Sequence, residues 1–351
     1  MNTKILLDIT HLAEFNFFKN AIEKMESFAE IDVIIRSRGQ LAQIMDCEFG
    51  KNKYVQIGKH YSTIYGKLFG LIYRNLEVIS YCHGKNYDLY TGFGSFYASF
   101  ASGFYRKPSV LFPDDYEYKL TYNLCKYSSD YLVVPDSIPS TGNVLKYRGF
   151  KELAYLHPNY FSPNKKVLDY YNLEPNEYVF IREISKRSLN YIDFDPIDLP
   201  TIIRSIYHAG LKVVVSLEDK NAYTKLENCI IINKPVDVFS LMHFALFSIS
   251  SGDSMARESC LVGTPTIYTG DRDMAVNTEF INKSCMFKVN NISDLNNTIQ
   301  NIIDNNIKME TKRTIERAIK SEWMDTTEVI VDVLLAIAYK NESALEKYTL
   351  D

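Results

Sequence analysis

One short segment in the second half of the chain combines residues that could bind phosphate and sugar hydroxyl groups. The apolar run Leu246–Ser250 predicts a buried strand, and the polar residues after it predict the start of a helix. Backbone amides at a helix start bind anions, and Gly252 lets the backbone approach a phosphate closely. Six residues further along, the carboxylate of Glu258 could accept hydrogen bonds from two ribose hydroxyls. We therefore expect a nucleoside diphosphate site formed by Ser251, Gly252, Asp253, Ser254, Met255 and Glu258.

The end of this helix completes a recognisable pattern. Gly263 stops the helix, and Thr264-Pro265 starts the next strand. The spacing of Gly252, Glu258, Gly263 and Pro265 resembles the donor-site motif of the glycosyltransferase-B superfamily. The likeness is to the N-acetylglucosaminyltransferase that makes lipid II and, more loosely, to the non-hydrolysing UDP-N-acetylglucosamine 2-epimerase. The resemblance implies a nucleotide-sugar donor carrying UDP or a near relative.

Nearly the whole chain resembles the domain of unknown function 354 family, which is placed in the same superfamily. Three groups of residues carry this second resemblance. They are residues 8–11 (Asp-Ile-Thr-His) with 17–20 (Phe-Phe-Lys-Asn), 149–152 (Gly-Phe-Lys-Glu) with 154–156 (Ala-Tyr-Leu), and 255–258 (Met-Ala-Arg-Glu) with 263–265 (Gly-Thr-Pro).

A simpler interpretation of the donor segment stays open. Gly252 could be an ordinary loop glycine and Glu258 an exposed helix carboxylate. Asp253 also departs from the epimerase pattern, which has two glycines after a serine. An ionised carboxylate there would repel a diphosphate unless it caps the helix or faces a hydroxyl or an amine.

The first half of the chain offers two kinds of candidate acid or base. His11 follows the first predicted strand, where a neutral imidazole could deprotonate an acceptor hydroxyl, and Asp8 could orient its ring. The alternative for His11 is that it only caps the first helix. Asp114 and Asp115 follow a later strand and could act as acid or base, or could cap the next helix.

Further residues could bind the acceptor or the donor phosphates. Gly92, Gly94 and Ser95 follow the strand Asp88–Thr91, and their amides are candidate acceptor-binding groups. Arg182 and Lys186 could supply cations to a leaving diphosphate, although a solvated basic loop explains them equally well. The glycosyltransferase-B resemblance implies that amides and cations neutralise the diphosphate, so no metal and no separate cofactor is expected.

The elements that must position these residues alternate between strand and helix in both halves of the chain. Such alternation predicts parallel sheets wrapped by helices, with ligands at the edge where the strands end. We expect an α/β fold of two Rossmann-like domains facing a cleft: an acceptor domain over 1–155 and a nucleotide-sugar domain over 156–325. A last helix within 326–351 is expected to pack back on the first domain.

Bulk properties limit the possible classes of protein. The 351 residues have a formal net charge of −4 and 46% hydrophobic residues, which is globular composition with no bulk reason to bind nucleic acid. Six scattered cysteines indicate reduced thiols. The apolar stretch Ile5–Leu7 is too short for a signal peptide, so we expect a cytoplasmic protein. The stretch Ser62–Tyr81 predicts an apolar helix stripe with basic flanks. That stripe is either core-facing or a peripheral membrane contact that meets a lipid-linked acceptor.

The expected activity is therefore transfer of a sugar from a nucleoside diphosphate to a sugar or lipid-linked acceptor, in cell-envelope or surface-polysaccharide assembly. The setting comes from the resemblance alone. A nucleotide-sugar 2-epimerase is the alternative enzyme, but its arginine-rich first loop and its later histidine-arginine stretch have no match here. A non-catalytic nucleotide-sugar-binding protein is the second alternative.

Overall fold

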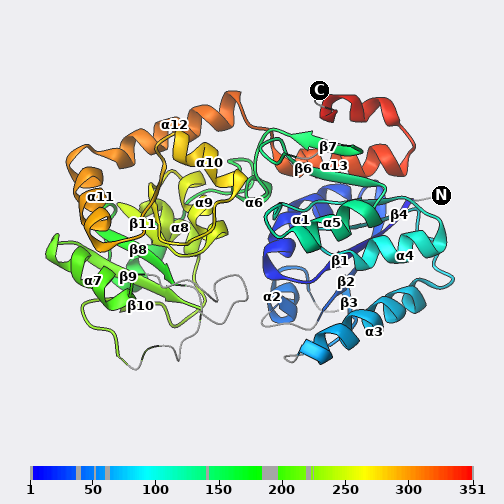
Figure 1. Cartoon of the computed structure of the whole chain (residues 1–351), viewed down its shortest axis with the longest axis horizontal. Coiled ribbons are helices and arrows are strands. Elements are labelled where there is room, and N and C mark those ends of the chain that lie inside the picture. The colour runs from blue at the N-terminus through cyan, green and yellow to red at the C-terminus, as the bar shows by residue number, and fades with distance from the viewer. Residues whose placement is uncertain are drawn as a thin grey trace. The chain divides into compact units, whose positions relative to one another are not determined.

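The computed structural model describes residues 3–36, 41–50, 53–59, 64–139, 142–183, 197–218, 223 and 225–349. The chain divides into two compact units, Met1–Tyr155 with Met324–Asp351, and Leu156–Trp323. Each unit contains one parallel sheet with helices packed on it, as Figure 1 shows. The predicted α/β fold of two Rossmann-like units is confirmed.

The first unit is built on a seven-stranded parallel sheet in the order β3-β2-β1-β4-β5-β6-β7. The strand order reverses between β1 and β4, where Asp8 pairs with Gly92. In such sheets, ligands bind outside the carboxyl ends of the strands at this reversal. The strands are β1 (Thr3–Ile9), β2 (Ala29–Ile35), β3 (Tyr54–Gln56), β4 (Leu89–Gly92), β5 (Ser109–Leu111), β6 (Tyr131–Pro135) and β7 (Val144–Tyr147).

Helices cover both faces of the first sheet, and one of them comes from the far end of the chain. The last long helix, α13, packs against α1, and the 3₁₀ helix η3 packs against β7. Thr326 and Thr327 fix the start of α13, because their hydroxyls donate to the carbonyls of Phe150 and Ala154. The helices are α1 (Leu12–Met25), α2 (Leu41–Glu48), α3 (Ile64–Cys82), α4 (Tyr97–Tyr105), α5 (Lys119–Ser128), α6 (Leu153–Leu156), α13 (Thr326–Ala338) and η3 (Glu342–Tyr348).

The second unit has a six-stranded parallel sheet in the order β10-β9-β8-β11-β12-β13. All four residues of β11 and the first four of β8 are buried, as expected for a parallel sheet covered by helices on both sides. Here the strand order reverses between β8 and β11, where Arg182 pairs with Ser250. The strands are β8 (Tyr178–Glu183), β9 (Lys212–Leu217), β10 (Ile230–Ile231), β11 (Phe247–Ser250), β12 (Thr266–Tyr268) and β13 (Met286–Lys288).

The helices of the second unit bury aliphatic side chains against this sheet. Ile202, Ile203 and Ile206 of α7 join a core with Val213 and Val215 of β9. None of the helices in the described ranges is long and apolar enough to cross a membrane. The helices are η1 (Lys165–Tyr171), α7 (Leu199–His208), α8 (Val238–Phe244), α9 (Asp253–Leu261), α10 (Ala275–Asn282), α11 (Ile292–Asp304) and α12 (Ile307–Ser321).

Candidate functional site

The turn from β11 into α9 presents an uncapped helix start at the carboxyl edge of the second sheet. Gly252 is the N-cap residue of α9, with φ −102° and ψ 132°, and it has no side chain to cap the helix. The hydroxyl of Ser250 holds this turn, because it accepts the Gly252 N–H at 3.1 Å and donates to the Gly252 carbonyl at 3.0 Å. The amides of the first helical turn have no acceptor within the helix, so this end of α9 favours an anion.

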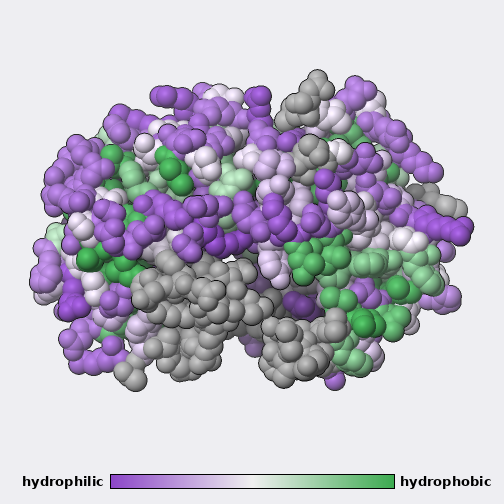
Figure 2. All heavy atoms as spheres, in the orientation of Figure 1, coloured by the Kyte–Doolittle hydropathy of each residue, from purple (hydrophilic) through white to green (hydrophobic). Residues whose placement is uncertain are grey.

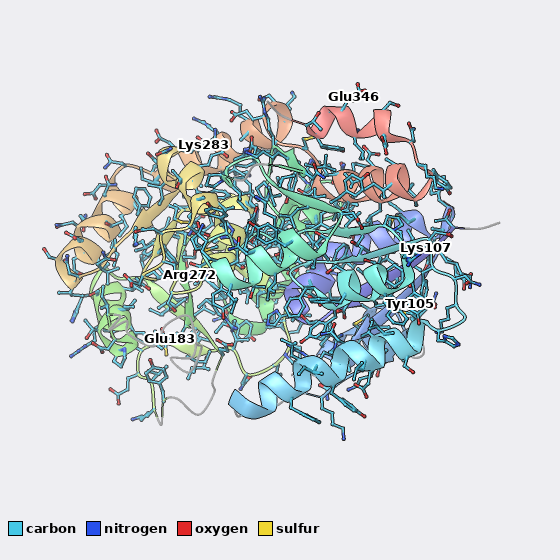
Figure 3. The ribbon with its side chains drawn as sticks, turned by 45° about the vertical axis from the view of Figure 1, so that its right-hand side comes forward. Tyr105, Lys107, Glu183, Arg272, Lys283 and Glu346 are labelled. Atoms are coloured by element: carbon cyan, nitrogen blue, oxygen red, sulfur yellow. The ribbon has the colours of Figure 1, made fainter. Side chains whose placement is uncertain are left out.

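Asp253, which departs from the epimerase pattern, is buried and paired. Its carboxylate accepts hydrogen bonds from the hydroxyl of Tyr268 and from the Arg272 guanidinium, the latter at 2.9 Å. Figure 3 labels Arg272 on this unit. The pairing supplies both conditions under which a carboxylate is tolerated beside a phosphate: a hydroxyl partner and a cationic partner. Tyr268 and Arg272 were not singled out in the sequence, because only the fold brings β12 and the following loop to the start of α9.

A glycine makes this arrangement sterically possible. The Tyr268 ring passes Gly270 so closely that a Cβ at that position would lie 2.3 Å from the Tyr268 hydroxyl oxygen. Any side chain at position 270 would therefore displace the tyrosine that meets Asp253. In the sequence, the only sign of this is that Gly270 comes two residues after Tyr268, the last residue of β12.

Glu258 lies on α9 and is buried, with 7% of its surface exposed. Its carboxylate interacts electrostatically with Arg182 at the end of β8. Burial lowers the pKa of Arg182, and the carboxylates of Glu218 and Glu258 oppose that shift. The Arg182 guanidinium also donates to the Ser216 hydroxyl at 2.8 Å. The structure thus brings together two residues that were predicted separately, Glu258 and Arg182.

Ser251, Ser254 and Met255, which were also predicted to bind the donor, lie at the same edge. The Ser251 N–H donates to the Arg182 carbonyl at 3.3 Å, which ties the α9 turn to β8. Ser254 and Met255 occupy the first turn of α9 and are half-buried. Lys186 lies outside the described residues. Gly263 follows the end of α9 with φ +83°, as predicted for a helix-stopping glycine.

In the first unit, Asp8 is fully buried and has two partners. Its two carboxylate oxygens receive the two terminal nitrogens of the Arg74 guanidinium, and Ser95 donates to the same carboxylate at 2.6 Å. The role expected for Asp8, orienting the His11 ring, is therefore not what the structure shows. Arg74 lies on α3, far along the chain from Asp8, so no spacing in the sequence indicates this ion pair.

The predicted acceptor-binding residues contribute to the same buried contact. A Cβ at Gly92 would lie 3.1 Å from the Asp8 carbonyl, so the glycine allows β1 and β4 to approach closely. Ser95 is buried with its hydroxyl directed at Asp8. The Gly94 carbonyl receives the Cys125 thiol. These residues lie before α4, which begins two residues after Ser95.

His11 is the N-cap residue of α1. Its Nδ1 accepts the Ala13 N–H at 3.3 Å. A neutral imidazole that accepts at Nδ1 carries its proton on Nε2 and can donate from there, but it cannot take up a proton at that atom. The arrangement matches the capping interpretation and makes His11 a hydrogen-bond donor toward any ligand at Nε2.

Glu14, one turn into α1, was not considered in the sequence. Its carboxylate accepts both the backbone N–H and the hydroxyl of Thr10. Burial raises the pKa of Glu14 to about 7, although the two bonds from Thr10 act against the shift. The start of α1 therefore contains a buried carboxyl group whose pKa lies close to neutral pH.

The two carboxylates after β5 have different surroundings. Asp114 is buried and paired with the Lys151 ammonium at 2.7 Å. Lys151 also lies 4.0 Å from Glu152 and 5.4 Å from the Phe93 ring centre. Asp115 accepts the Tyr118 N–H at 3.2 Å and so stabilises the turn before α5, whose N-cap residue, Tyr118, has no side-chain cap. Within the described ranges no cluster of three or more metal-ligating side chains occurs.

Comparison with known proteins places the whole chain in one family. The sequence profile of the family described as protein of unknown function DUF354 matches residues 3–338. An uncharacterized protein of Methanocaldococcus jannaschii is 22% identical over 317 residues, which is 86% of this chain and 92% of that protein.

Solved structures with the same fold include two kinds of enzyme. The UDP-N-acetylglucosamine 2-epimerase of Rickettsia bellii superposes with a TM-score of 0.71 at 14% identity, over 98% of this chain and 99% of that chain. The spinosyn forosaminyltransferase gives 0.68 at 11% identity, over 96% and 100%. The Neisseria meningitidis UDP-GlcNAc 2-epimerase, solved with UDP-GlcNAc bound, gives 0.66 at 14% identity, over 95% and 100%. At these identities the comparison establishes the glycosyltransferase-B fold.

Proposed function

Because this chain belongs to the DUF354 family and has the glycosyltransferase-B fold, we propose that it binds a nucleoside diphosphate sugar at the start of α9 and transfers the sugar to an acceptor. The observation that carries the proposal is the uncapped start of α9, with the Asp253 carboxylate already paired to Arg272 and Tyr268. This pairing removes the electrostatic objection to a phosphate at that position.

The donor would be held by amides, cations and one carboxylate of the second unit. The α9 amides and the guanidinium of Arg272 would meet the diphosphate, and Arg182 lies at the adjoining strand end. Glu258 would accept hydrogen bonds from the ribose hydroxyls. The leaving nucleoside diphosphate would then be neutralised without a metal ion. Structures of this fold solved with UDP-GlcNAc support the choice of a uridine nucleotide.

The reaction proposed is a direct displacement at the anomeric carbon. The C–O bond to the acceptor forms, the bond to the diphosphate oxygen breaks, and the acceptor proton passes to a base of the first unit. His11 and Asp114 are the candidates, and each must leave a present partner to act. His11 would have to give up the Ala13 N–H at Nδ1, and Asp114 would have to separate from Lys151. Cell-envelope or surface-polysaccharide assembly is the setting we favour.

A nucleotide-sugar 2-epimerase remains the second candidate, because epimerases and glycosyltransferases superpose on this chain with similar scores. The two activities have different products. An epimerase converts its substrate without any acceptor, whereas a transferase releases nucleoside diphosphate only as the acceptor is consumed. A non-catalytic binding protein would do neither.

The test begins with a thermal-shift screen of nucleotides and nucleotide sugars at millimolar concentration. A ligand at 100 times its Kd stabilises the native state by about 2.7 kcal/mol. We expect a uridine diphosphate sugar to raise the Tm, and no shift with any of these ligands would contradict the donor site. The ligand found is then incubated alone, and separately with candidate acceptors. Nuclear magnetic resonance of the sugar distinguishes an epimerised donor from transfer with release of nucleoside diphosphate.

A further inference from the structure

Three neighbouring helices of the first unit carry an extensive exposed apolar surface. Ten of the nineteen large hydrophobic side chains that are exposed in the described ranges lie on α3, on α4 or at α5. Figure 2 shows hydrophobic atoms gathered over this part of the first unit. We call this set the α3–α5 surface. Its members are Phe69, Ile72, Tyr73, Leu76, Phe100, Phe104, Tyr118, Leu120, Leu124 and Tyr127.

The topology places the three helices on one face of the sheet. They follow β3, β4 and β5, and right-handed crossovers in one direction along a sheet put successive helices on the same face. The contacts agree, because α4 packs against both α3 and α5. Figure 3 shows α3 and α4 side by side, with Tyr105 and Lys107 labelled at the end of α4. The exposed side chains therefore form one layer.

A groove runs between α4 and α5 within this surface. Its volume is about 520 Å³, and Phe100, Leu120, Leu124 and Tyr127 line it. Monomeric soluble proteins rarely expose a contiguous apolar area of this kind unless it binds something. Six of the ten side chains are phenylalanine or tyrosine, which gather where a protein meets the boundary between lipid tails and headgroups.

The charges of the same helices are basic, although the chain as a whole is acidic. Among the charged side chains that the structure describes on these helices, Arg74, Lys119 and Lys126 are basic and only Glu77 is acidic, in a chain with a formal net charge of −4. Arg74 is used in the buried pair with Asp8. Lysines 119 and 126 lie on α5, the helix that contributes most side chains to the groove.

From these observations we propose that the α3–α5 surface docks on an anionic lipid bilayer. Aromatic and aliphatic side chains would enter the headgroup boundary, and the lysines of α5 would meet lipid phosphates. A second copy of the chain fits less well, because a two-fold interface would bring the lysines of both copies together. The inference does not depend on the proposed sugar transfer.

The test is co-sedimentation of the full chain with vesicles. We expect binding to phosphatidylcholine vesicles that contain phosphatidylglycerol, much weaker binding to phosphatidylcholine alone, and loss of binding at high salt. The double variant Lys119→Gln/Lys126→Gln should lower the partition coefficient about 25-fold, or about fivefold for each lysine. Leu120→Ser/Tyr127→Ser should lower it at least about tenfold.

A matched control separates this surface from exposed aromatics in general. Tyr170 and Tyr207 are exposed on the second unit, Tyr170 at 80% compared with 82% for Tyr127. Tyr170→Ser/Tyr207→Ser should therefore bind vesicles like the parent. If Leu120→Ser/Tyr127→Ser does not fold, Phe104→Ser removes one exposed side chain of α4 and should still reduce binding.

Three outcomes would overturn the proposal. The first is the absence of vesicle binding, and the second is binding that neither salt nor the lysine variants change. The third is a concentration-dependent dimer in sedimentation velocity that Leu120→Ser/Tyr127→Ser dissociates, without vesicle binding. That result would assign the surface to a second copy of the chain.

Discussion

The Arg272 guanidinium lies 2.9 Å from the Asp253 carboxylate, at the first turn of α9. The two groups form a largely buried ion pair at the proposed phosphate site. Removing one partner of such a pair leaves the other charge uncompensated, which costs more than the pair itself contributes. As long as the pair is intact, the negative charge of Asp253 is compensated and does not repel a diphosphate at the start of α9.

Arg272→Gln should weaken donor binding by about 1–3 kcal/mol, because Asp253 would then oppose the diphosphate without its cation. Isothermal titration calorimetry with the nucleotide sugar measures this change. The double variant Asp253→Asn/Arg272→Gln removes both charges and should recover part of the affinity. Equal affinities of Arg272→Gln and the parent would place the diphosphate elsewhere.

Glu258→Gln should also weaken donor binding, by roughly 1–3 kcal/mol, because an amide accepts ribose hydroxyls less strongly than a carboxylate does. The fold should persist, which circular dichroism and the Tm can check. A 2′-deoxyribose donor analogue offers a sharper comparison. The parent and Glu258→Gln should bind this analogue with similar affinity, because the analogue lacks a hydroxyl that Glu258 would otherwise bind.

His11→Ala and His11→Asn separate catalysis from capping. Asparagine caps a helix as well as or better than most residues, whereas alanine costs about 1 kcal/mol of stability. If His11 acts on the acceptor, both variants should lower kcat by about 10²–10⁴ and leave donor affinity nearly unchanged. If it only caps α1, His11→Asn should keep full activity and stability. In that case Asp114 becomes the next residue to replace.

Glu14→Gln should change how stability depends on pH. The pKa of Glu14 in the folded chain is raised to about 7, against 4.5 for an unperturbed glutamate, so the folded state holds a proton that the unfolded state releases. The free energy of unfolding of the parent should therefore fall by at most about 3 kcal/mol as pH rises from 4.5 to 7. Above pH 7, ionisation of Glu14 should not change it further.

Urea unfolding of the parent and of Glu14→Gln at several pH values measures this effect. Glutamine mimics the protonated carboxyl group. As pH rises from 4.5 to 7, Glu14→Gln should therefore become more stable relative to the parent. Glu23→Gln, at an exposed position on the same helix, should follow the parent. Parallel curves for the parent and Glu14→Gln would show that Glu14 ionises normally.

Local patterns predicted the elements well where the strands are long and apolar. The β1 and β11 strands and Gly263 at the end of α9 follow from hydrophobic runs and helix-stop chemistry. The short strands β7 and β13 were missed, because Val144–Tyr147 and Met286–Lys288 are too brief and too polar to stand out.

Partners within the candidate site were harder to predict, because they depend on long-range pairing. Asp253 was recognised as out of place beside a phosphate, but its partner Arg272 comes from a loop after another strand. Asp8 was assigned to His11 because they are close in sequence, whereas two strands and two helices lie between Asp8 and Arg74, its ion-pair partner. The role of such residues depends on their tertiary contacts, and the spacing of residues in the sequence does not reveal those contacts.

The return of α13 to the first unit affects how this chain can fold during synthesis. Its first unit lacks the helix that packs on α1 until Leu156–Trp323 has been made. At 5–20 residues per second this takes roughly 10–30 s, during which an apolar face of the nascent first unit stays open to chaperones or to aggregation. The order of translation thus favours a second unit that folds before the first is finished.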